Sequence, residues 1–282
     1  MRSKNFQDKK PLLYLVATPI GNLEDFSPRA LKTLLEVDLI ACEDTRVTGR
    51  LLSFFQIKKP LYSLREHNEV QASEYVIEKM KEGTKVAYVS DAGYPGISDP
   101  GQLLVEHALK NDINVSVIPG ANALLTALVA SGLDSSKFYF HGFLSAKESE
   151  RINELKDLSK RKETIIFYEA PHRIEKTLGD LMSIFGNRSI CIARELTKLH
   201  EEYIRDTLEN VLELDMSTIK GEIVLVIEGN RNETPINIDD TELIKMVNCL
   251  ERNGVSTKDA IKRVSENTSI PKNYIYKIYH MN

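Results

Sequence analysis

The feature that most constrains this chain is a loop rich in glycine and proline, which runs from Val89 to Gly101 as Val-Ser-Asp-Ala-Gly-Tyr-Pro-Gly-Ile-Ser-Asp-Pro-Gly. It follows an apolar run at 85–89 that is typical of a buried strand, and its glycines and prolines stop that strand. Glycine lets a backbone approach a ligand closely, and proline reduces the freedom of the loop. An ordinary strand-to-helix turn has only about two to six residues. The segment therefore predicts a ligand-binding loop at the carboxyl end of a strand, with Pro100 at the first position of the next helix.

Apolar runs alternate with helical patterns through most of the chain, which predicts an α/β fold with two α/β domains. The first five strands should form a mainly parallel sheet covered on both faces. No G-x-G-x-x-G follows the first strand, which disfavours a dinucleotide-type Rossmann fold. Strands are expected at 12–17, 38–42, 61–64, 85–89 and 114–118, and in a second set at 138–140, 164–168, 189–193, 200–206 and 222–227.

The domain organisation predicted from these patterns has three parts. An N-terminal α/β domain is expected at 1–119 and a second α/β domain at 120–230. A polar linker at 228–240 then leads to a helix-turn-helix-like segment at 241–282, with three short helices at 242–252, 256–266 and 271–280.

Charge is distributed unevenly along the 282 residues. The whole chain carries a formal net charge of −4, but residues 241–282 contain seven lysines and arginines against four acidic residues. A tail of +3 on a body of −7 suggests a polyanionic partner for the tail, although a solvated helical face would have the same composition.

Several sequence features exclude classes of protein. No apolar run approaches the roughly 18 residues of a membrane span, and the polar N-terminus is not a secretory signal. The cysteines Cys42, Cys191 and Cys249 are odd in number and far apart, which favours a reduced, cytoplasmic protein and argues against a zinc or other metal site. There is no P-loop, H-E-x-x-H motif or Ser/His/Asp order, so the sequence gives no support to a kinase, a metalloenzyme or a hydrolase.

Six segments rich in polar or special-backbone residues follow predicted strands. Since the carboxyl ends of parallel strands share one edge of a sheet, these segments are expected to converge on one cleft. Each has a simpler interpretation: Glu43, Asp44 and Arg46 could form a helix cap with an ion pair, and His67 a surface residue. The segments are 18–25, 43–46, 65–68, 90–101, 169–173 and 194–198.

Taken together, eight ordered motifs resemble the bacterial ribosomal RNA small-subunit methyltransferase I family, within the tetrapyrrole-methylase-like, class III S-adenosylmethionine (SAM) methyltransferases. The first loop, Thr18-Pro19-Ile20-Gly21-Asn22, differs from the Gly-Pro-Gly-Asp type of the tetrapyrrole methylases themselves, which favours the RNA branch. Tyr94 and Ala121-Asn122 depart from the Thr and Pro-Ser that are common in relatives. The motifs lie at 16–25, 43–46, 66–69, 90–101, 142–144, 168–173, 194–198 and 220–222.

The resemblance implies a dimeric enzyme that holds SAM between two α/β domains. It also implies methyl transfer to the ribose 2′-oxygen of a cytidine in the decoding region of 16S rRNA, within the small ribosomal subunit. The cofactor-binding residues it implies are Pro19, Ser90, Asp91, Ala92, Gly93, Tyr94, Pro95, Ser98, Ala121, Asn122, Tyr168, Ala193, Arg194, Gly221 and Glu222.

Two further groups of residues are assigned by their chemistry. A neutral 2′-hydroxyl is a poor nucleophile, so a carboxylate that accepts its proton is expected at Glu43, Asp44 or Asp99. Cations and a histidine at strand ends suit contacts with RNA, namely Arg46, His67, Arg173 and Lys198.

Two alternative functions stay open. A small-molecule methyltransferase of the tetrapyrrole or diphthine type would have the same fold. A non-catalytic RNA-binding assembly factor would keep the fold without turnover, although the intact glycine and proline loops argue against it.

Overall fold

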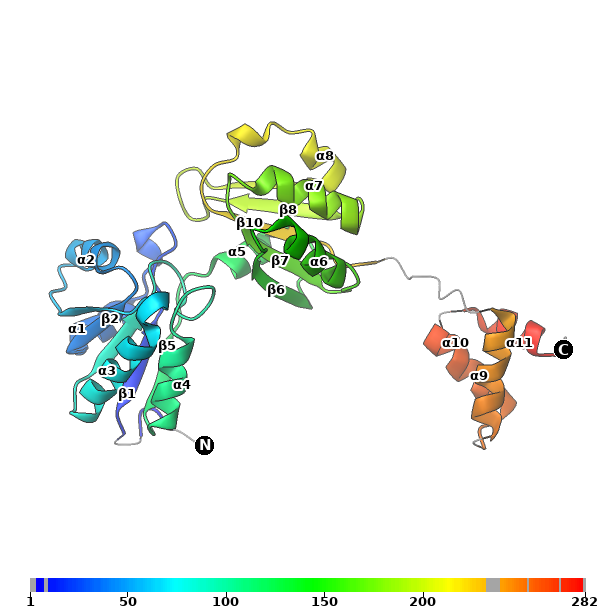
Figure 1. The fold of residues 1–282 in the computed structure, drawn as a ribbon, viewed down its shortest axis with the longest axis horizontal. Coiled ribbons are helices and arrows are strands. Elements are labelled where there is room, and N and C mark those ends of the chain that lie inside the picture. The colour runs from blue at the N-terminus through cyan, green and yellow to red at the C-terminus, as the bar shows by residue number, and fades with distance from the viewer. Residues whose placement is uncertain (1–3, 8–9, 232–238, 253, 269, 281–282) are drawn as a thin grey trace. The chain divides into compact units, whose positions relative to one another are not determined.

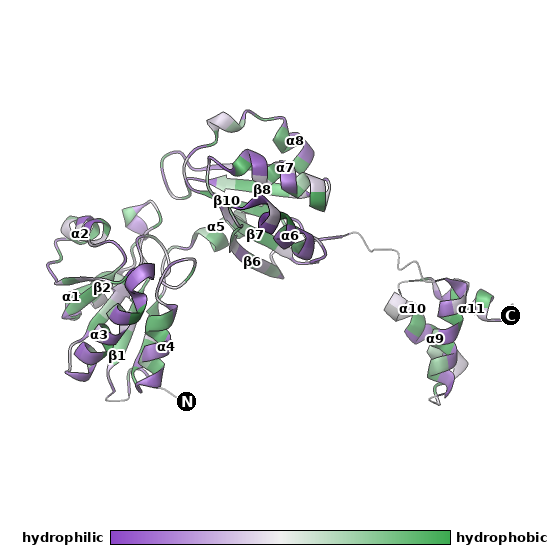
Figure 2. Cartoon of the chain, in the orientation of Figure 1, coloured by the Kyte–Doolittle hydropathy of each residue, from purple (hydrophilic) through white to green (hydrophobic). Residues whose placement is uncertain are grey.

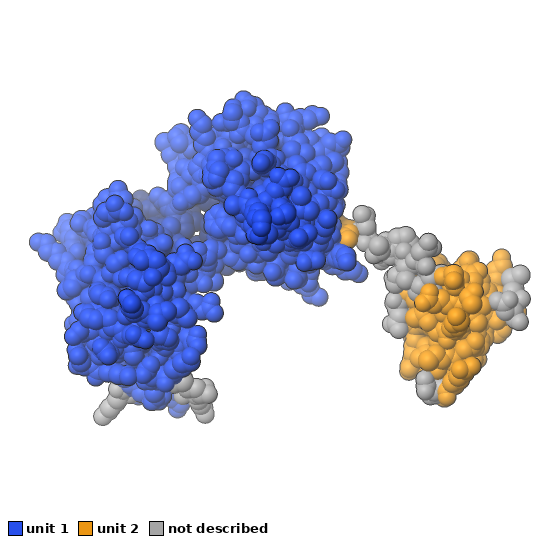
Figure 3. All heavy atoms as spheres, viewed as in Figure 1, with its two compact units in different colours: residues 1–229 blue, residues 230–282 orange. Residues whose placement is uncertain are grey.

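The computed structural model describes residues 4–7, 10–231, 239–252, 254–268 and 270–280. The chain divides into two compact units, Met1–Gly229 and Asn230–Asn282, which are coloured separately in Figure 3. The predicted linker at 228–240 falls partly outside the described residues. Both sheets lie in the first unit, and the division of that unit at 119/120 stays a prediction.

The first sheet is parallel throughout, with strand order β3-β2-β4-β1-β5, which confirms that part of the predicted fold (Figure 1). Alternate residues of β4 face opposite sides: Val86 and Tyr88 belong to one buried cluster, Ala87 and Val89 to another. Helices therefore cover both faces, as parallel sheets require. The strands are β1 (Leu12–Val16), β2 (Leu39–Cys42), β3 (Leu61–Ser63), β4 (Val86–Val89) and β5 (Asn114–Ile118); the helices are α1 (Pro28–Glu36), α2 (Thr45–Phe54), α3 (Glu69–Lys81) and α4 (Gln102–Lys110), with 3₁₀ turns at Leu23–Asp25 and Glu66–Asn68.

The second sheet is mixed, with strand order β6-β7-β10-β8-β9. β6 pairs parallel with β7, whereas β10 runs antiparallel to both β7 and β8. The strands that carry the predicted segments 169–173 and 194–198, β7 and β8, nevertheless run in the same direction. The strands are β6 (Phe138–Phe143), β7 (Thr164–Glu169), β8 (Ser189–Arg194), β9 (Glu202–Thr207) and β10 (Ile223–Ile227).

The mixed topology still gathers the functional segments at one edge. Since β7 and β8 both run antiparallel to β10, they end at the same edge of the sheet, and β10 begins there. Ile223, the first residue of β10, is paired with Glu169 on one side and with Arg194 on the other. The segment just before β10, which contains Gly221 and Glu222, consequently lies beside the ends of β7 and β8.

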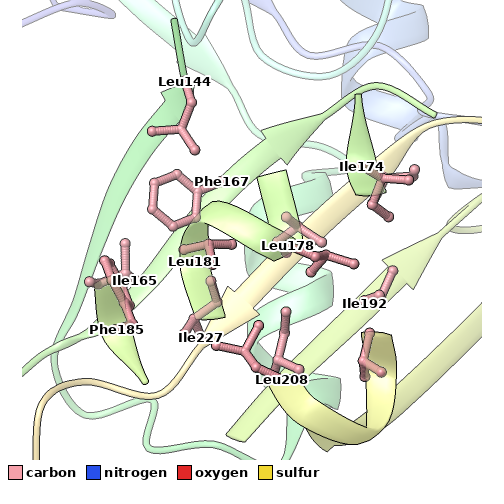
Figure 4. Close-up of a cluster of buried hydrophobic side chains, with 14 of the residues drawn as sticks. Leu144, Ile165, Phe167, Ile174, Leu178, Leu181, Phe185, Ile192, Leu208 and Ile227 are labelled. Carbon is pink, nitrogen blue, oxygen red and sulfur yellow. The ribbon is translucent and has the colours of Figure 1, made fainter. Parts of the chain in front are cut away.

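Apolar side chains cover both faces of the second sheet. Phe167 and Ile192 pack on one face with residues of α7 (Ile174–Phe185) and α8 (Leu208–Leu212), as Figure 4 shows. Leu155 and Leu158 of α6 (Glu148–Leu158) belong to the same buried cluster. On the opposite face the sheet packs against α5 (Ala123–Ser131). Figure 2 shows the same division, with hydrophobic colour on the strands and hydrophilic colour on the outer sides of helices.

The loop after β4 is fixed at its far end by α3. The carboxylate of Glu69 accepts hydrogen bonds from the backbone N–H groups of Gly101 (2.8 Å) and Leu103 (3.1 Å), which begin α4. Gly101, at φ +130°, precedes the helix, so the prediction that Pro100 occupies its first position is wrong. A side chain at Gly101 would meet the ring of Tyr88 at 2.7 Å, and the Tyr88 hydroxyl donates to the carbonyl of Pro100 (3.0 Å).

The second unit contains the three predicted helices: α9 (Asp240–Arg252), α10 (Thr257–Thr268) and α11 (Lys272–His280). Leu243, Val247, Ile261, Val264 and Ile275 are buried between them and form a small core of their own. In the part of the chain that the structure describes, no helix has the length and apolar character needed to cross a membrane.

The substitution Glu69→Ala should lower the free energy of unfolding by about 1–2 kcal/mol, because two N–H groups at the start of α4 lose a charged acceptor. Urea denaturation measures the change. Glu74→Ala, an exposed change on the same helix, is the control and should change it by less than about 0.5 kcal/mol. Equal effects of the two substitutions would contradict the capping role.

Candidate active site

A cavity of about 330 Å³ lies where the loop after β4 meets the second sheet. One wall comes from the loop that ends β4 and from Ile20 in the loop after β1. The other comes from the ends of β6 and β7, the start of α5 and the start of β10. The lining residues are Ile20, Ala92, Gly93, Tyr94, Ile97, Ser98, Asp99, Asn122, Ala123, Phe143, Tyr168, Glu169, Ala170, Pro171, Gly221, Glu222, Ile223 and Val224.

Backbone hydrogen bonds hold the cavity loop in place. Thr18 and Gly93 exchange both of their backbone bonds (2.9 and 3.1 Å), which joins the loops after β1 and β4. The Ser90 hydroxyl donates to the carbonyl of Gly93 (3.2 Å), and the Tyr94 hydroxyl accepts from the N–H of Gly120 (3.2 Å). Gly93 has φ +77° and Ser98 φ +61°, so the loop has the left-handed turns that its glycine content predicts.

The cavity wall that comes from the loop after β4 carries one carboxyl group, that of Asp99. Burial raises the pKa of Asp99 to about 6, and the neighbouring carboxylates of Glu43 and Asp91 contribute to the rise. Burial also raises the pKa values of Glu43 and Asp91 themselves. Asp99 is therefore a carboxylate that is ionised near neutral pH and still basic enough to accept a proton.

Asp44 has a different environment from Asp99. Its carboxylate caps α2 by accepting from the N–H of Arg46 (2.8 Å), and it pairs with the Arg46 guanidinium (2.5 Å). Hydrogen bonds from Arg46 lower the pKa of Asp44. The N–H of Asp44 donates to Asp91 (3.1 Å), which links the start of α2 to the cavity loop. The helix-cap interpretation of this segment is thus confirmed.

Buried polar contacts hold the wall on the second sheet. Glu169 is buried, and its carboxylate accepts from the Thr177 hydroxyl (2.5 Å) and the N–H of Ala170 (2.8 Å). The Arg173 guanidinium pairs with Glu169 (3.3 Å) and donates to the carbonyl of Leu144 (2.8 Å). Arg173 thus connects the ends of β6 and β7, beside the lining residues Phe143 and Ala170.

Tyr168 closes the cavity between these walls. Its ring makes edge contacts with Phe140 and Phe143, at 4.9 and 5.6 Å between centroids. Burial raises the pKa of Tyr168 to about 12, with a contribution from Asp99, so the hydroxyl stays protonated at neutral pH.

Lys198 lies at the rim, where its ammonium pairs with Glu195 (2.8 Å) and Glu222 (3.0 Å). The loop after β1 approaches closely: the N–H of Asn22 donates to Thr197 (3.0 Å), and a Cβ at Gly21 would lie 2.5 Å from Lys198. These contacts tie the loop after β1 to the loop after β8.

The structure brings part of the predicted cofactor set together. Ala92, Gly93, Tyr94, Ser98, Asn122, Tyr168, Gly221 and Glu222 line the cavity. The remainder lie outside that lining, where Ser90 braces the loop and Arg194 pairs with Glu202. These are Pro19, Ser90, Asp91, Pro95, Ala121, Ala193 and Arg194.

The other predicted residues are distributed around the cavity. Of the three predicted catalytic acids, Asp99 lines it, whereas Glu43 and Asp44 are not among the lining residues. Arg46 and His67 are exposed at the edge of the first sheet. Their roles, and those of Arg173 and Lys198, stay predictions.

Sequence reasoning missed the apolar lining. Ile20, Ile97, Phe143 and Pro171 lie inside motifs that the resemblance used, but nothing in their residue type singles them out. Ala123, Ile223 and Val224 had no signal beyond their place next to Asn122 and Glu222. The lining is visible only once β10 is known to begin at this edge.

Comparison with known proteins identifies the class to which this fold and cavity belong. The sequence matches a family model described as Tetrapyrrole (Corrin/Porphyrin) Methylases over residues 12–212. Structures of the methyltransferase CobJ and of diphthine synthase have the same fold, with TM-scores of 0.60 and 0.58 over 78% and 77% of this chain and 95% and 89% of theirs, at 18% and 16% identity. The chain belongs to this family and has its fold.

Three close relatives narrow this class. Proteins named Ribosomal RNA small subunit methyltransferase I are 47% identical in Halalkalibacterium halodurans, 44% in Bacillus subtilis and 45% in Synechocystis. These matches cover 97%, 99% and 95% of this chain, and 96%, 98% and 96% of the relatives. The chain belongs to the ribosomal RNA small subunit methyltransferase I family.

The methyl donor of this methyltransferase is SAM, and the cavity suits it chemically. Ile20, Ile97 and Val224 offer apolar surface for a flat ring system. Glu222 supplies negative charge for a positively charged group of the cofactor. At Gly93 an added Cβ would lie 3.5 Å from Ile20 and 3.9 Å from the carbonyl of Ala121, so a side chain there would narrow the cavity.

Arg173→Lys should weaken SAM binding about tenfold in the absence of RNA. A lysine can pair with Glu169 or reach the carbonyl of Leu144, but it lacks the planar fork that does both, and one charged hydrogen bond is worth about 1.5 kcal/mol. Isothermal calorimetry with SAM measures the change.

The control for this prediction is Arg188→Lys, because the Arg188 guanidinium also donates to a backbone carbonyl, that of Ser159 (2.6 Å), away from the cavity. It should leave SAM affinity unchanged. Unchanged SAM affinity in Arg173→Lys, with a higher KM for RNA, would instead support a phosphate contact.

Proposed function

We propose that this chain methylates the ribose 2′-hydroxyl of a cytidine in the decoding region of 16S rRNA, with SAM as donor. The observation that carries the proposal is Asp99, a half-buried carboxyl with raised pKa on the wall of the cavity that suits SAM. The relatives named Ribosomal RNA small subunit methyltransferase I support the substrate class. Mass mapping of rRNA from cells with and without the protein tests it: one 2′-O-methylcytidine should disappear when the protein is absent.

The residues of this chain would act chiefly by alignment and proton transfer. Bound SAM supplies an electrophilic methyl group, so the protein's main task is to hold a ribose oxygen in line with it. Asp99 would accept the proton of the attacking hydroxyl, which typically accelerates such a step by about 10²–10⁴-fold. Glu43 and Asp91, which keep the pKa of Asp99 high, would tune this base.

The target nucleotide has to be accessible to the cavity. Side chains cannot reach into the deep groove of an A-form duplex, so the target would be single-stranded or turned out of its helix. Arg46 and Lys198 would contact its phosphates, and His67, exposed at the edge of the first sheet, would contribute to the same RNA contacts.

The protein is further proposed to work as a homodimer in the cytoplasm, where the small ribosomal subunit is found. The family resemblance supports the dimer, and the ribosomal substrate supports the location. The helical tail would add electrostatic affinity, because the rest of the chain carries net negative charge.

Asp99→Asn should lower the rate of methyl transfer by about 10²–10⁴-fold while SAM still binds. In the wild type, the rate should be constant above about pH 7 and fall about tenfold per pH unit below about pH 6, as Asp99 takes up a proton. Single-turnover rates with labelled SAM measure both effects.

A stability measurement on Asp99→Asn distinguishes a slower methyl transfer from a loss of folded protein. The folded-state pKa of Asp99 is raised, so its ionised form opposes folding above about pH 6, and Asp99→Asn should be at least as stable as the wild type at pH 8. Asp157→Asn, an exposed change, is the control. A wild-type rate in Asp99→Asn would rule out Asp99 as the base.

Deletion of residues 241–282 should weaken binding to the small ribosomal subunit by about tenfold or more at 0.1 M salt and leave SAM affinity unchanged. The deleted segment carries a net charge of +3, and each lost phosphate contact lowers the salt dependence of binding. Filter binding over a salt series measures this. If RNA affinity and salt slope stay as in the full chain, the tail serves another purpose.

A further inference from the structure

Helix α2 carries a row of exposed side chains that the site described above does not use. Arg46, Arg50 and Phe54 are spaced four residues apart, so they follow one another along one side of the helix over about 12 Å. All three are exposed, Arg46 by 81% of its side chain and Phe54 by 63%. We name these three residues the α2 row.

The aromatic end of the row is held from beneath. Phe54 contacts Phe55 edge-on at 5.0 Å between centroids, and Phe55 in turn contacts the buried Phe26 at 5.3 Å. The Phe54 ring is thus supported by the core and keeps most of its surface in solvent. A supported, exposed ring of this kind is suited to stacking on a base.

The charged part of the row is available to an anion. Among the residues that the structure describes, none forms a hydrogen bond or ion pair with the Arg50 guanidinium. Arg46 is paired with Asp44 and still mostly exposed. On a body with a charge of −7, an exposed cation such as Arg50 is where a polyanion gains attraction.

The row begins next to the cavity loop. The N–H of Asp44, the cap of α2, donates to the carboxylate of Asp91 (3.1 Å), and Asp91 lies in the loop that carries Asp99. Figure 1 shows α2 toward the end of the first sheet from which this loop emerges. An RNA strand whose target nucleotide enters the cavity would therefore continue along α2.

We propose that the α2 row is a docking surface for single-stranded rRNA next to the target nucleotide, with Arg50 on a phosphate and Phe54 stacked on a base. This rests on the proposed function, because it takes rRNA as the substrate. Arg46, at the start of α2, contacts the phosphate closest to the target. The surface acts in binding alone, since neither Arg50 nor Phe54 lines the cavity.

The test is the steady-state kinetics of methyl transfer from labelled SAM to purified small ribosomal subunits. Arg50→Ala and Phe54→Ala should each raise the KM for subunits about tenfold and leave kcat and SAM affinity unchanged. Arg50→Ala should also lower the salt slope of binding by about one, whereas Phe54→Ala should not change it. Phe54→Trp keeps an aromatic face at this position, so its KM should stay near that of the wild type.

Matched controls are Lys81→Ala, an exposed cation on α3, and Leu35→Ala, an exposed apolar change on α1. Neither should change KM. A wild-type KM in both α2 variants would overturn the docking surface and leave the proposed function intact. A wild type that transfers no methyl group to rRNA would overturn both. If Phe54→Ala changed the oligomeric state and not KM, the row would belong to an interface between copies, which also overturns the proposal.

Discussion

The position of one carboxyl group, that of Asp99, is set by the contacts that fix the loop after β4 at both of its ends. The loop that carries it is fixed at one end by the backbone pair of Thr18 and Gly93 and at the other by the Glu69 carboxylate at the start of α4. Between these points the loop turns through left-handed conformations and places Asp99 at the cavity. Partial burial there raises the pKa of Asp99, because burial disfavours the charged form of the carboxyl group. The contacts that hold the loop have to offset this cost.

The second sheet completes this environment through its topology. Because β10 runs against β7 and β8, its first residues come to the edge where those strands end. The wall formed there is stiff: Glu169 and Arg173 satisfy each other and the surrounding backbone, so little of their hydrogen-bonding capacity remains for a ligand. At the rim, the Lys198 ammonium pairs with Glu195 and with the lining residue Glu222. Charged residues near the cavity thus divide into those that hold its shape and those that face it.

Much of the fold could be predicted from local patterns in the sequence. The strand and helix order, the parallel first sheet and the helical tail follow from apolar periodicity and from turn residues, as at Gly132, which ends α5 in a left-handed conformation. The antiparallel direction of β10 had no local signal, because a short buried strand looks alike in either direction. For the same reason the apolar lining, such as Ile20 and Phe143, was missed: its position depends on contacts between distant segments. Motifs placed eight of the fifteen proposed cofactor residues at the cavity and left Ala193 and Pro95 buried outside its lining.

A crystal structure of the protein with bound SAM is the most direct test of the central claim, that the loop after β4 and the edge of the second sheet form one cofactor site. The account predicts that SAM contacts Gly93 and Val224 from opposite sides, with its methyl group facing the space beside Asp99. SAM bound elsewhere, or with Asp99 shielded from the methyl group by the cofactor itself, would contradict it.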